Sequence, residues 1–165
     1  MNKLEVIQNK VFSDDKLKQQ LAIWRFLDKK IVFTNGVFDL LHLGHIDYLS
    51  KAKDEGNILI VGVNTDNSTR RLNKGKNRPL TNQQSRSTIL ASLLFVDAVV
   101  LFDEDTPYKL IQQIQPDVLV KGSDYKTEDI VGYDIVSAKG GKVVTIDFLE
   151  GYSTTAIEMK IKGGE

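Results

Sequence analysis

Short runs of apolar residues recur along the chain, and segments with helical spacing separate them. The runs are continuous and rich in β-branched residues, as is typical of strands buried on both faces of a sheet. They lie at residues 31–34, 58–63, 98–102, 118–120 and 142–146. Strands that alternate with helices through right-handed crossovers form a parallel sheet with helices on both faces. The pattern therefore predicts a doubly wound α/β fold of about five strands.

Periodicity and capping signals predict helices between these strands. Residues 45–55 carry apolar side chains at helical spacing and stop at Gly56, which suits a left-handed cap. Two capping boxes indicate further helix starts, one at residues 81–84 (TNQQ) and one at residues 155–158 (TAIE).

The N-terminal region has an amphipathic segment of its own at residues 16–27. It is either a helix that packs on the domain or a subunit contact, and packing is the favoured interpretation. We therefore expect a helical extension at residues 1–29, followed by the main domain at residues 30–165. The apolar residues at helical spacing are Leu17, Leu21, Trp24 and Leu27.

Composition and charge narrow the class of protein. The 22 basic and 22 acidic residues cancel, so no overall field attracts nucleic acid or a membrane. The one local shift is a basic, glycine-containing run at residues 70–79. The chain has no cysteine, which excludes a disulfide scaffold and a thiolate metal site. It begins without a signal-like segment and has no run of membrane-spanning length, so we expect a cytoplasmic protein.

The chain has two histidines, His42 and His45, and they flank Gly44 just after the first predicted strand. In a parallel α/β sheet, ligands bind beyond the carboxyl ends of the strands, at the switch point. Gly36 would allow a sharp turn there, and Gly44 would let an anion approach the backbone at a helix start. The imidazoles could donate hydrogen bonds to phosphate oxygens and stabilise charge in a transition state.

Other phosphate and metal signatures are missing. The chain contains no P-loop, no G-x-G-x-x-G fingerprint and no H-E-x-x-H. Two histidines could surround a metal together with Asp39, but a three-residue spacing around a glycine is not a usual zinc pattern. We therefore predict no metal site formed by side chains.

The run at residues 42–45 (HLGH), preceded by residues 36–39 (GVFD), resembles the H-x-G-H signature of the cytidylyltransferase-like nucleotidyltransferases. Residues 151–155 (GYSTT) resemble their second landmark, at the start of a late helix. The resemblance implies a Rossmann-like nucleotidyltransferase fold. Within this superfamily the chain most resembles the adenylyltransferase domain of ADP-heptose synthases. The closer match lies at residues 34–39, 63–66, 77–79, 104–107, 116–125 and 151–155.

This resemblance implies a reaction. A sugar 1-phosphate, here D-glycero-β-D-manno-heptose 1-phosphate, attacks the α-phosphorus of ATP and gives an ADP-sugar and pyrophosphate, for lipopolysaccharide or surface heptose synthesis. ATP would be a substrate, and Mg²⁺ is expected because a triphosphate needs more positive charge than two histidines supply. A sugar kinase domain, which precedes this domain in many such proteins, is not in the chain, so a separate kinase is expected. We also expect a homodimer or larger homo-oligomer.

The resemblance and the chemistry of the residues assign roles. The expected catalytic residues are His42, His45 and Lys121. The residues expected to bind the nucleotide are Thr34, Asn35, Gly36, Phe38, Gly44, Asp124, Gly151, Ser153, Thr154 and Thr155. The residues expected at the sugar phosphate or pyrophosphate are Asp39, Lys74, Lys76, Arg78 and Arg86. Asp39 is expected to orient the loop or a cation and not to act as a base.

Two other functions stay open. A glycerol-3-phosphate-type cytidylyltransferase would use CTP, but such enzymes usually carry an arginine in a run like Arg-Thr-Glu-Gly, where residues 148–151 read FLEG. A non-catalytic nucleotide-binding module would have little use for the pair His42 and His45.

Overall fold

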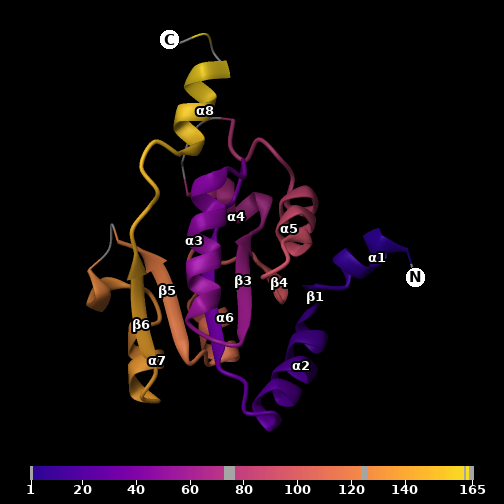
Figure 1. The fold of residues 1–165 in the computed structure, drawn as a ribbon, viewed down its shortest axis with the longest axis vertical. Coiled ribbons are helices and arrows are strands. Elements are labelled where there is room, and N and C mark those ends of the chain that lie inside the picture. The colour runs from indigo at the N-terminus through magenta and orange to yellow at the C-terminus, as the bar shows by residue number, and fades with distance from the viewer. Residues whose placement is uncertain (1, 73–76, 124–125, 162, 164–165) are drawn as a thin grey trace.

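The computed structural model describes residues 2–72, 77–123, 126–161 and 163. Within these residues, six parallel strands form one sheet in the order β1-β4-β3-β2-β5-β6 (Figure 1). The predicted doubly wound α/β class is confirmed, with one strand more than expected. The strands are β1 (Val11–Phe12), β2 (Ile31–Gly36), β3 (Ile58–Asn64), β4 (Ala98–Phe102), β5 (Val118–Gly122) and β6 (Lys142–Ile146).

Helices cover both faces of the sheet (Figure 1). No helix among the residues described is long and apolar enough to cross a bilayer. The helices are α1 (Lys3–Gln8), α2 (Asp14–Phe26), α3 (Leu43–Asp54), α4 (Asp66–Arg71), α5 (Gln83–Ser92), α6 (Tyr108–Ile114), the 3₁₀ turn η1 (Thr127–Asp129), α7 (Tyr133–Ala138) and α8 (Thr154–Ile161).

The core consists of two apolar layers, one on each face of the sheet. Phe33 and Val32 are neighbours in β2 and are both fully buried, Phe33 in one layer and Val32 in the other. The first layer receives side chains from α2, α6 and α7, and the second receives them from α3 and α5. Burial on both faces explains why the strands are continuous apolar runs in the sequence.

The N-terminal region shares this core. Strand β1 pairs with β4 at the edge of the sheet, with Val11 opposite Val99. Helix α2 buries the predicted residues Leu17, Leu21 and Trp24 in the first layer. Its last predicted apolar position, Leu27, is 53% exposed. Residues 2–29 therefore contribute two helices and one strand, and β1 and α2 join the sheet and the core of the main domain.

The helix caps differ from the predicted capping boxes, by one residue at α5 and by two residues at α8. Asn82, and not Thr81, caps α5, because its side-chain oxygen accepts a hydrogen bond from the Ser85 amide at 2.8 Å. At α8 the hydroxyl of Ser153 accepts from the Ala156 amide at 3.0 Å, and the helix begins at the next residue. A side-chain cap is present at both helices, one residue after the predicted position at α5 and two residues before it at α8.

Gly56, predicted as a left-handed cap, is a glycine for another reason. It is not among the glycines with positive φ. A Cβ at this position would lie 2.6 Å from Cγ2 of Val32 and 2.8 Å from the carbonyl oxygen of Lys30. The absence of a side chain therefore allows the end of α3 to pass closely over β2.

The strand order defines where a ligand can bind. From β2 the chain proceeds to β3 and β4 on one side of the sheet, and later to β5 and β6 on the other. Adjacent strands whose connections leave in opposite directions form a crevice at their carboxyl ends. Here those strands are β2 and β5, and α3 follows β2 so that its N-terminus faces the crevice.

Truncation on α2 tests whether the N-terminal region belongs to the core. Leu17 has no exposed surface, so Leu17→Ala should lower the free energy of unfolding by about 2–5 kcal/mol. Phe26, on the same helix, is 88% exposed, so Phe26→Ala should change it by no more than about 0.5 kcal/mol. Urea denaturation followed by circular dichroism measures both. Equal effects of the two substitutions on the free energy of unfolding would show that Leu17 of α2 is not part of the domain core.

Candidate active site

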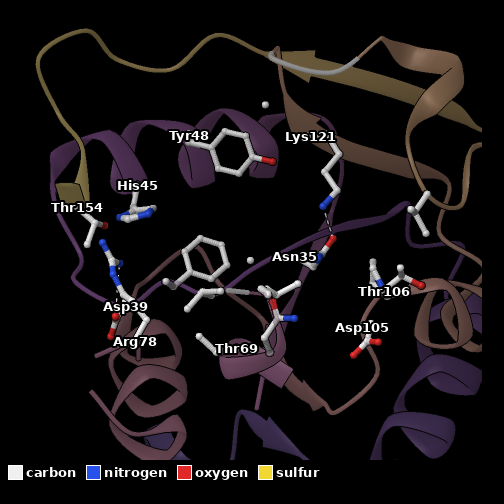
Figure 2. Close-up of a pocket in the computed structure, with 18 of the residues that line it drawn as sticks. Asn35, Asp39, His45, Tyr48, Thr69, Arg78, Asp105, Thr106, Lys121 and Thr154 are labelled. Atoms are coloured by element: carbon white, nitrogen blue, oxygen red, sulfur yellow. Dashed lines mark hydrogen bonds and ion pairs between the residues drawn. The ribbon is translucent and has the colours of Figure 1, made fainter. Parts of the chain in front are cut away.

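A cleft of about 550 Å³ lies at the carboxyl ends of β2, β3 and β5, where the strand order predicts a ligand site (Figure 2). Residues from the β2–α3 loop, the end of β3, the start of α6, the end of β5 and the start of α8 line it. The predicted site residues found in its lining are Asn35, Gly36, Phe38, Asp39, His45, Arg78, Lys121, Thr154 and Thr155.

The two histidines lie together at the start of α3. His42 is the N-cap residue, with extended backbone, and its side chain makes no capping hydrogen bond. His45 is in the first turn, and the two imidazole rings stack with their centroids 3.9 Å apart and 28° between their planes. The ring of Phe38 packs against His45 at 5.4 Å. A three-residue spacing places both rings on one face of the helix.

Burial sets the charge of this pair. The Nδ1 atoms of His42 and His45 are buried and have no hydrogen-bond partner within the described residues. Burial lowers the pKa of His42, and burial together with the neighbouring His42 lowers the pKa of His45 to about 4. Both rings are therefore neutral near pH 7, and each carries one N–H donor. An anion placed next to them would raise both pKa values.

Two glycines make room for the rings of this loop. A Cβ at Gly44 would lie 3.1 Å from the imidazole of His42 and 3.1 Å from Cβ of Tyr152. A Cβ at Gly36 would lie 3.0 Å from the ring of Phe38, whose own φ of 52° is left-handed. Gly44 was expected to leave space for an anion; in the structure it leaves space for side chains of the site itself.

Thr34 does not line the cleft, although it was predicted to bind the nucleotide. It is fully buried, and its hydroxyl shares a hydrogen bond of 2.8 Å with the hydroxyl of Tyr48. Tyr48 lies one turn after His45 on α3 and does line the cleft (Figure 2). Thr34 therefore fixes α3 to β2 from below, and this contact holds the histidine turn in place.

Lys121 and Asn35 meet across the crevice between β5 and β2. The ammonium group of Lys121 donates a hydrogen bond of 2.5 Å to the side-chain oxygen of Asn35 (Figure 2). Both residues lie at the carboxyl ends of their strands. The hydrogen bond to Asn35 therefore holds the positive charge of Lys121 at the crevice between β2 and β5.

Asp39 fixes the loop that leads into α5. Its buried carboxylate accepts hydrogen bonds from the Leu80 amide at 2.8 and 2.9 Å and from the Thr81 amide at 2.9 Å. The Thr81 hydroxyl donates to the same carboxylate at 3.2 Å. Several donors already occupy this carboxylate, so its contacts are those of a residue that orients the loop.

Arg78 connects this loop to the last helix. Its Nε lies 2.9 Å from a carboxylate oxygen of Glu158 on α8, and one terminal nitrogen lies 3.5 Å from Asp39. Glu158 was the last member of the predicted capping box at residues 155–158, and its carboxylate is used in this long-range contact instead. Arg78 thus holds the wall of the cleft that carries Thr154 and Thr155.

The predicted contact between Arg86 and a substrate phosphate does not fit the structure. Arg86 is buried, and its guanidinium donates to the carbonyl of Val37 at 2.7 Å and to the carbonyl of Thr81 at 3.0 Å. A third donor meets a carboxylate oxygen of Asp66 at 2.6 Å. All of these acceptors belong to the protein, so Arg86 holds three segments together beneath the site.

The other predicted residues lie at the margin of the cleft or outside the described part. Ser153 caps α8 and does not line the cleft, and Gly151 has a left-handed φ of 83° with open space around it. The positions Lys74, Lys76 and Asp124 lie outside the described residues.

Sequence reasoning assigned no role to several lining residues. Tyr48, Thr69 and Asp129 belong to no motif, and Asn64 and Asp105 lie in runs that resemble the family but were not singled out within them. The general rule for ligand sites in parallel sheets could have found those that follow strands. Within the described residues, no group of three or more histidines, aspartates or glutamates could hold a metal ion.

Comparison with known proteins defines the class. Residues 33–159, more than half of the chain, match the cytidylyltransferase-like family. The chain therefore belongs to this family and is a nucleotidyltransferase, which confirms the resemblance seen in the H-x-G-H run.

The relatives are longer proteins. The chain is 51% identical over 156 residues to the bifunctional protein HldE of Wolinella succinogenes, which covers 94% of this chain and 32% of the relative. It is 52% identical over 153 residues to the protein of the same name from Citrifermentans bemidjiense, covering 93% and 31%. The chain thus spans about a third of the length of these relatives.

Solved structures have the same fold. A lipopolysaccharide core biosynthesis protein from Thermoplasma volcanium is similar with a TM-score of 0.61 and 32% identity, over 76% of this chain and 99% of that one. A pantoate–β-alanine ligase from Francisella tularensis, with β,γ-ATP and β-alanine, has a TM-score of 0.57 and 23% identity, over 88% and 75%. The second likeness shows the fold alone.

The lowered pKa of His45 makes the stability of the ligand-free protein depend on pH. An unfolded histidine titrates near pH 6.5, whereas His45 in the folded protein titrates at about 4. Between these values the unfolded chain binds more protons, so the free energy of unfolding falls as pH decreases from about 6.5 to about 4. In His45→Gln the free energy of unfolding should fall less over this pH range.

Urea denaturation at several pH values between 7 and 4 measures the effect. The carboxylates titrate in both proteins, so the difference between the two curves isolates His45. Parallel curves for wild type and His45→Gln would contradict the assigned pKa.

Proposed function

We propose that this chain is a heptose 1-phosphate adenylyltransferase, which joins ATP and D-glycero-β-D-manno-heptose 1-phosphate to give an ADP-sugar and pyrophosphate. The observation that carries the proposal is the stacked pair His42 and His45 at the N-terminus of α3, where His45 lines the cleft at the switch point of the sheet and His42 packs against it. The identity of about 50% to bifunctional HldE proteins supports the heptose branch. The separate kinase, the homo-oligomer and the cytoplasmic location stay predictions from the sequence.

The reaction needs positioning and charge stabilisation. An oxygen of the sugar phosphate forms a bond to the α-phosphorus of ATP while the bond to the leaving pyrophosphate breaks, so no nucleophilic side chain is required. His42 and His45 would donate N–H groups to phosphate oxygens at the helix N-terminus, where backbone amides and the helix dipole also favour negative charge. The phosphates would raise the pKa of both rings, so that binding draws protons to the site.

Cationic groups on the other walls complete this arrangement. Lys121, held by Asn35, is placed to neutralise charge at the reacting phosphates across the crevice. Arg78 lies in the wall next to the histidines. Mg²⁺ would arrive bound to the triphosphate as part of the substrate, since the described residues form no metal cluster.

Aromatic residues near α8 favour a purine. Phe148 lines the cleft, and its ring centroid lies 6.0 Å from that of Tyr48. An apolar ring at the position where glycerol-3-phosphate cytidylyltransferases carry an arginine suits the flat face of adenine.

Turnover with both nucleotides tests the proposed function. With the heptose 1-phosphate as acceptor, kcat/KM for ATP should exceed that for CTP by at least roughly tenfold, about 1.4 kcal/mol. Pyrophosphate release is measured side by side for both nucleotides, with glycerol 3-phosphate as the competing acceptor. A preference for CTP and glycerol 3-phosphate would place the chain in the cytidylyltransferase branch. Nucleotide binding without pyrophosphate release from any acceptor would indicate a binding module.

Removal of each imidazole tests the catalytic assignment. His42→Ala and His45→Ala should each lower kcat by roughly a hundred- to a thousandfold, because each removes a donor to charge that develops in the transition state. The Kd for ATP should change much less. Leu43→Ala is the matched control, since Leu43 lies between them in the same turn with its side chain exposed. Near-normal turnover in either histidine variant would contradict the assignment.

A further inference from the structure

The polar groups of the cleft divide into two regions. Figure 2 shows His45 and Arg78 on one side of the cleft and Asp105 and Thr106 on the other, with the amine of Lys121 lying between them in this view. The first region offers donors and positive charge, which suit a triphosphate, and the carboxylate of Asp39 there is already bound by the Leu80 and Thr81 amides. The second region offers carboxylate and hydroxyl oxygens, and a carboxylate repels a phosphate at close range. The triphosphate therefore belongs to the first region, and the second region needs another ligand.

Asp105 is held in place by the protein without losing its capacity to accept hydrogen bonds. Nε of Arg71, the last residue of α4, lies 2.6 Å from Oδ1 of Asp105. The same guanidinium also donates to the carbonyl of Asp103, so the loop before α6 is attached at two points. An ionised carboxylate has about four acceptor sites on its two oxygens, and Arg71 occupies one of them.

Two more acceptors line the same cleft from other elements. Asp129, at the end of η1, has a carboxylate that makes no hydrogen bond or ion pair with any described residue. Asn64, the last residue of β3, is only 4% exposed, and its Nδ2 donates to the hydroxyl of Ser68 at 2.9 Å. The Oδ1 of Asn64 accepts no hydrogen bond from the residues described. Asn64 lines the cleft, so a ligand there can supply the donor that this oxygen lacks.

All three side chains can accept hydrogen bonds from hydroxyl groups. We propose that Asn64, Asp105 and Asp129 form the acceptor-sugar subsite, which binds the hydroxyl groups of the sugar 1-phosphate and thereby sets acceptor specificity. The proposal rests on the proposed function, since it assigns the second substrate of that reaction to one region of the cleft. Each carboxylate accepts from one or two sugar hydroxyls, and the sugar phosphate is directed toward Lys121 and the nucleotide. A neutral polyol has the donors that these oxygens lack, and it introduces no charge that they would repel.

Alanine variants of the two carboxylates test this subsite. In Asp105→Ala and Asp129→Ala the KM for the heptose 1-phosphate should rise at least roughly tenfold, the size expected for a lost hydrogen bond to a charged group. The KM for ATP should stay within about twofold of wild type, and kcat should change little. Asp15→Ala, an exposed carboxylate on α2 far along the chain from the cleft, is the matched control and should leave all three unchanged.

A binding measurement separates this inference from the proposed function. Calorimetric titration of the heptose 1-phosphate into protein saturated with a non-hydrolysable ATP analogue should show weaker binding in both variants. Inorganic phosphate, which lacks the sugar hydroxyls, should bind them as tightly as wild type or more tightly, because a negative charge has been removed. Opposite changes for the two probes would support the subsite.

Three results would overturn it. Unchanged sugar affinity in both variants, with normal wild-type turnover, overturns the subsite and leaves the proposed function in place. An equal rise in the KM for ATP would assign the carboxylates to the nucleotide or its metal ion and overturns the subsite as well. Wild-type protein that neither binds the sugar 1-phosphate nor releases pyrophosphate overturns both.

Discussion

The architecture of this protein depends on the burial of β2 on both faces at the centre of a parallel sheet. Its residues face two apolar layers, and its neighbours are β3 on one side and β5 on the other. The chain continues from β2 to β3 on one side of the sheet and reaches β5 on the other side later. A crevice therefore forms beyond the carboxyl ends of β2 and β5. The chain must turn there, and the turn carries the loop and the helix start that provide the histidine pair. The site is thus a consequence of where β2 ends.

Buried polar contacts join β2 and the loop that follows it to the neighbouring loops and helices of the site. The hydroxyl pair of Thr34 and Tyr48 joins β2 to α3 beneath the histidine turn. Asp39 attaches the loop before α5 to the loop after β2. Arg86 joins the same region to the start of α4. Buried polar groups are costly unless they are paired, so each of these contacts specifies one arrangement of the segments that it connects.

The sequence predicted the parts of the fold that depend on local pattern. The central strands and α2 follow from apolar runs and periodicity, and the H-x-G-H run located the histidine turn. Strand β1 was missed because its two residues have no pattern of their own and are ordered by pairing with β4. Thr34 and Arg86 were assigned to ligands because a polar residue near a site looks functional in the sequence. Most of their partners lie 14 to 49 residues away in the chain, and no local rule identifies such contacts. Asp105 and Asp129 were given no role because the sequence does not show which carboxylates the fold brings to the cleft.

Helix α8 has a different kind of attachment from the rest of the domain. No residue of α8 is fully buried, whereas α3 buries Tyr48, Leu49 and Ala52. What ties α8 to the loop before α5 is the ion pair between Glu158 and Arg78. The side chains of Arg78 and Glu158 are only 14% and 22% exposed, so salt screens this pair less than it screens a pair in full contact with solvent. The wall of the cleft that carries Thr154 and Thr155 therefore depends on one partly buried ion pair, so a change that removes either charge loosens that wall while the sheet beneath it keeps its two apolar layers.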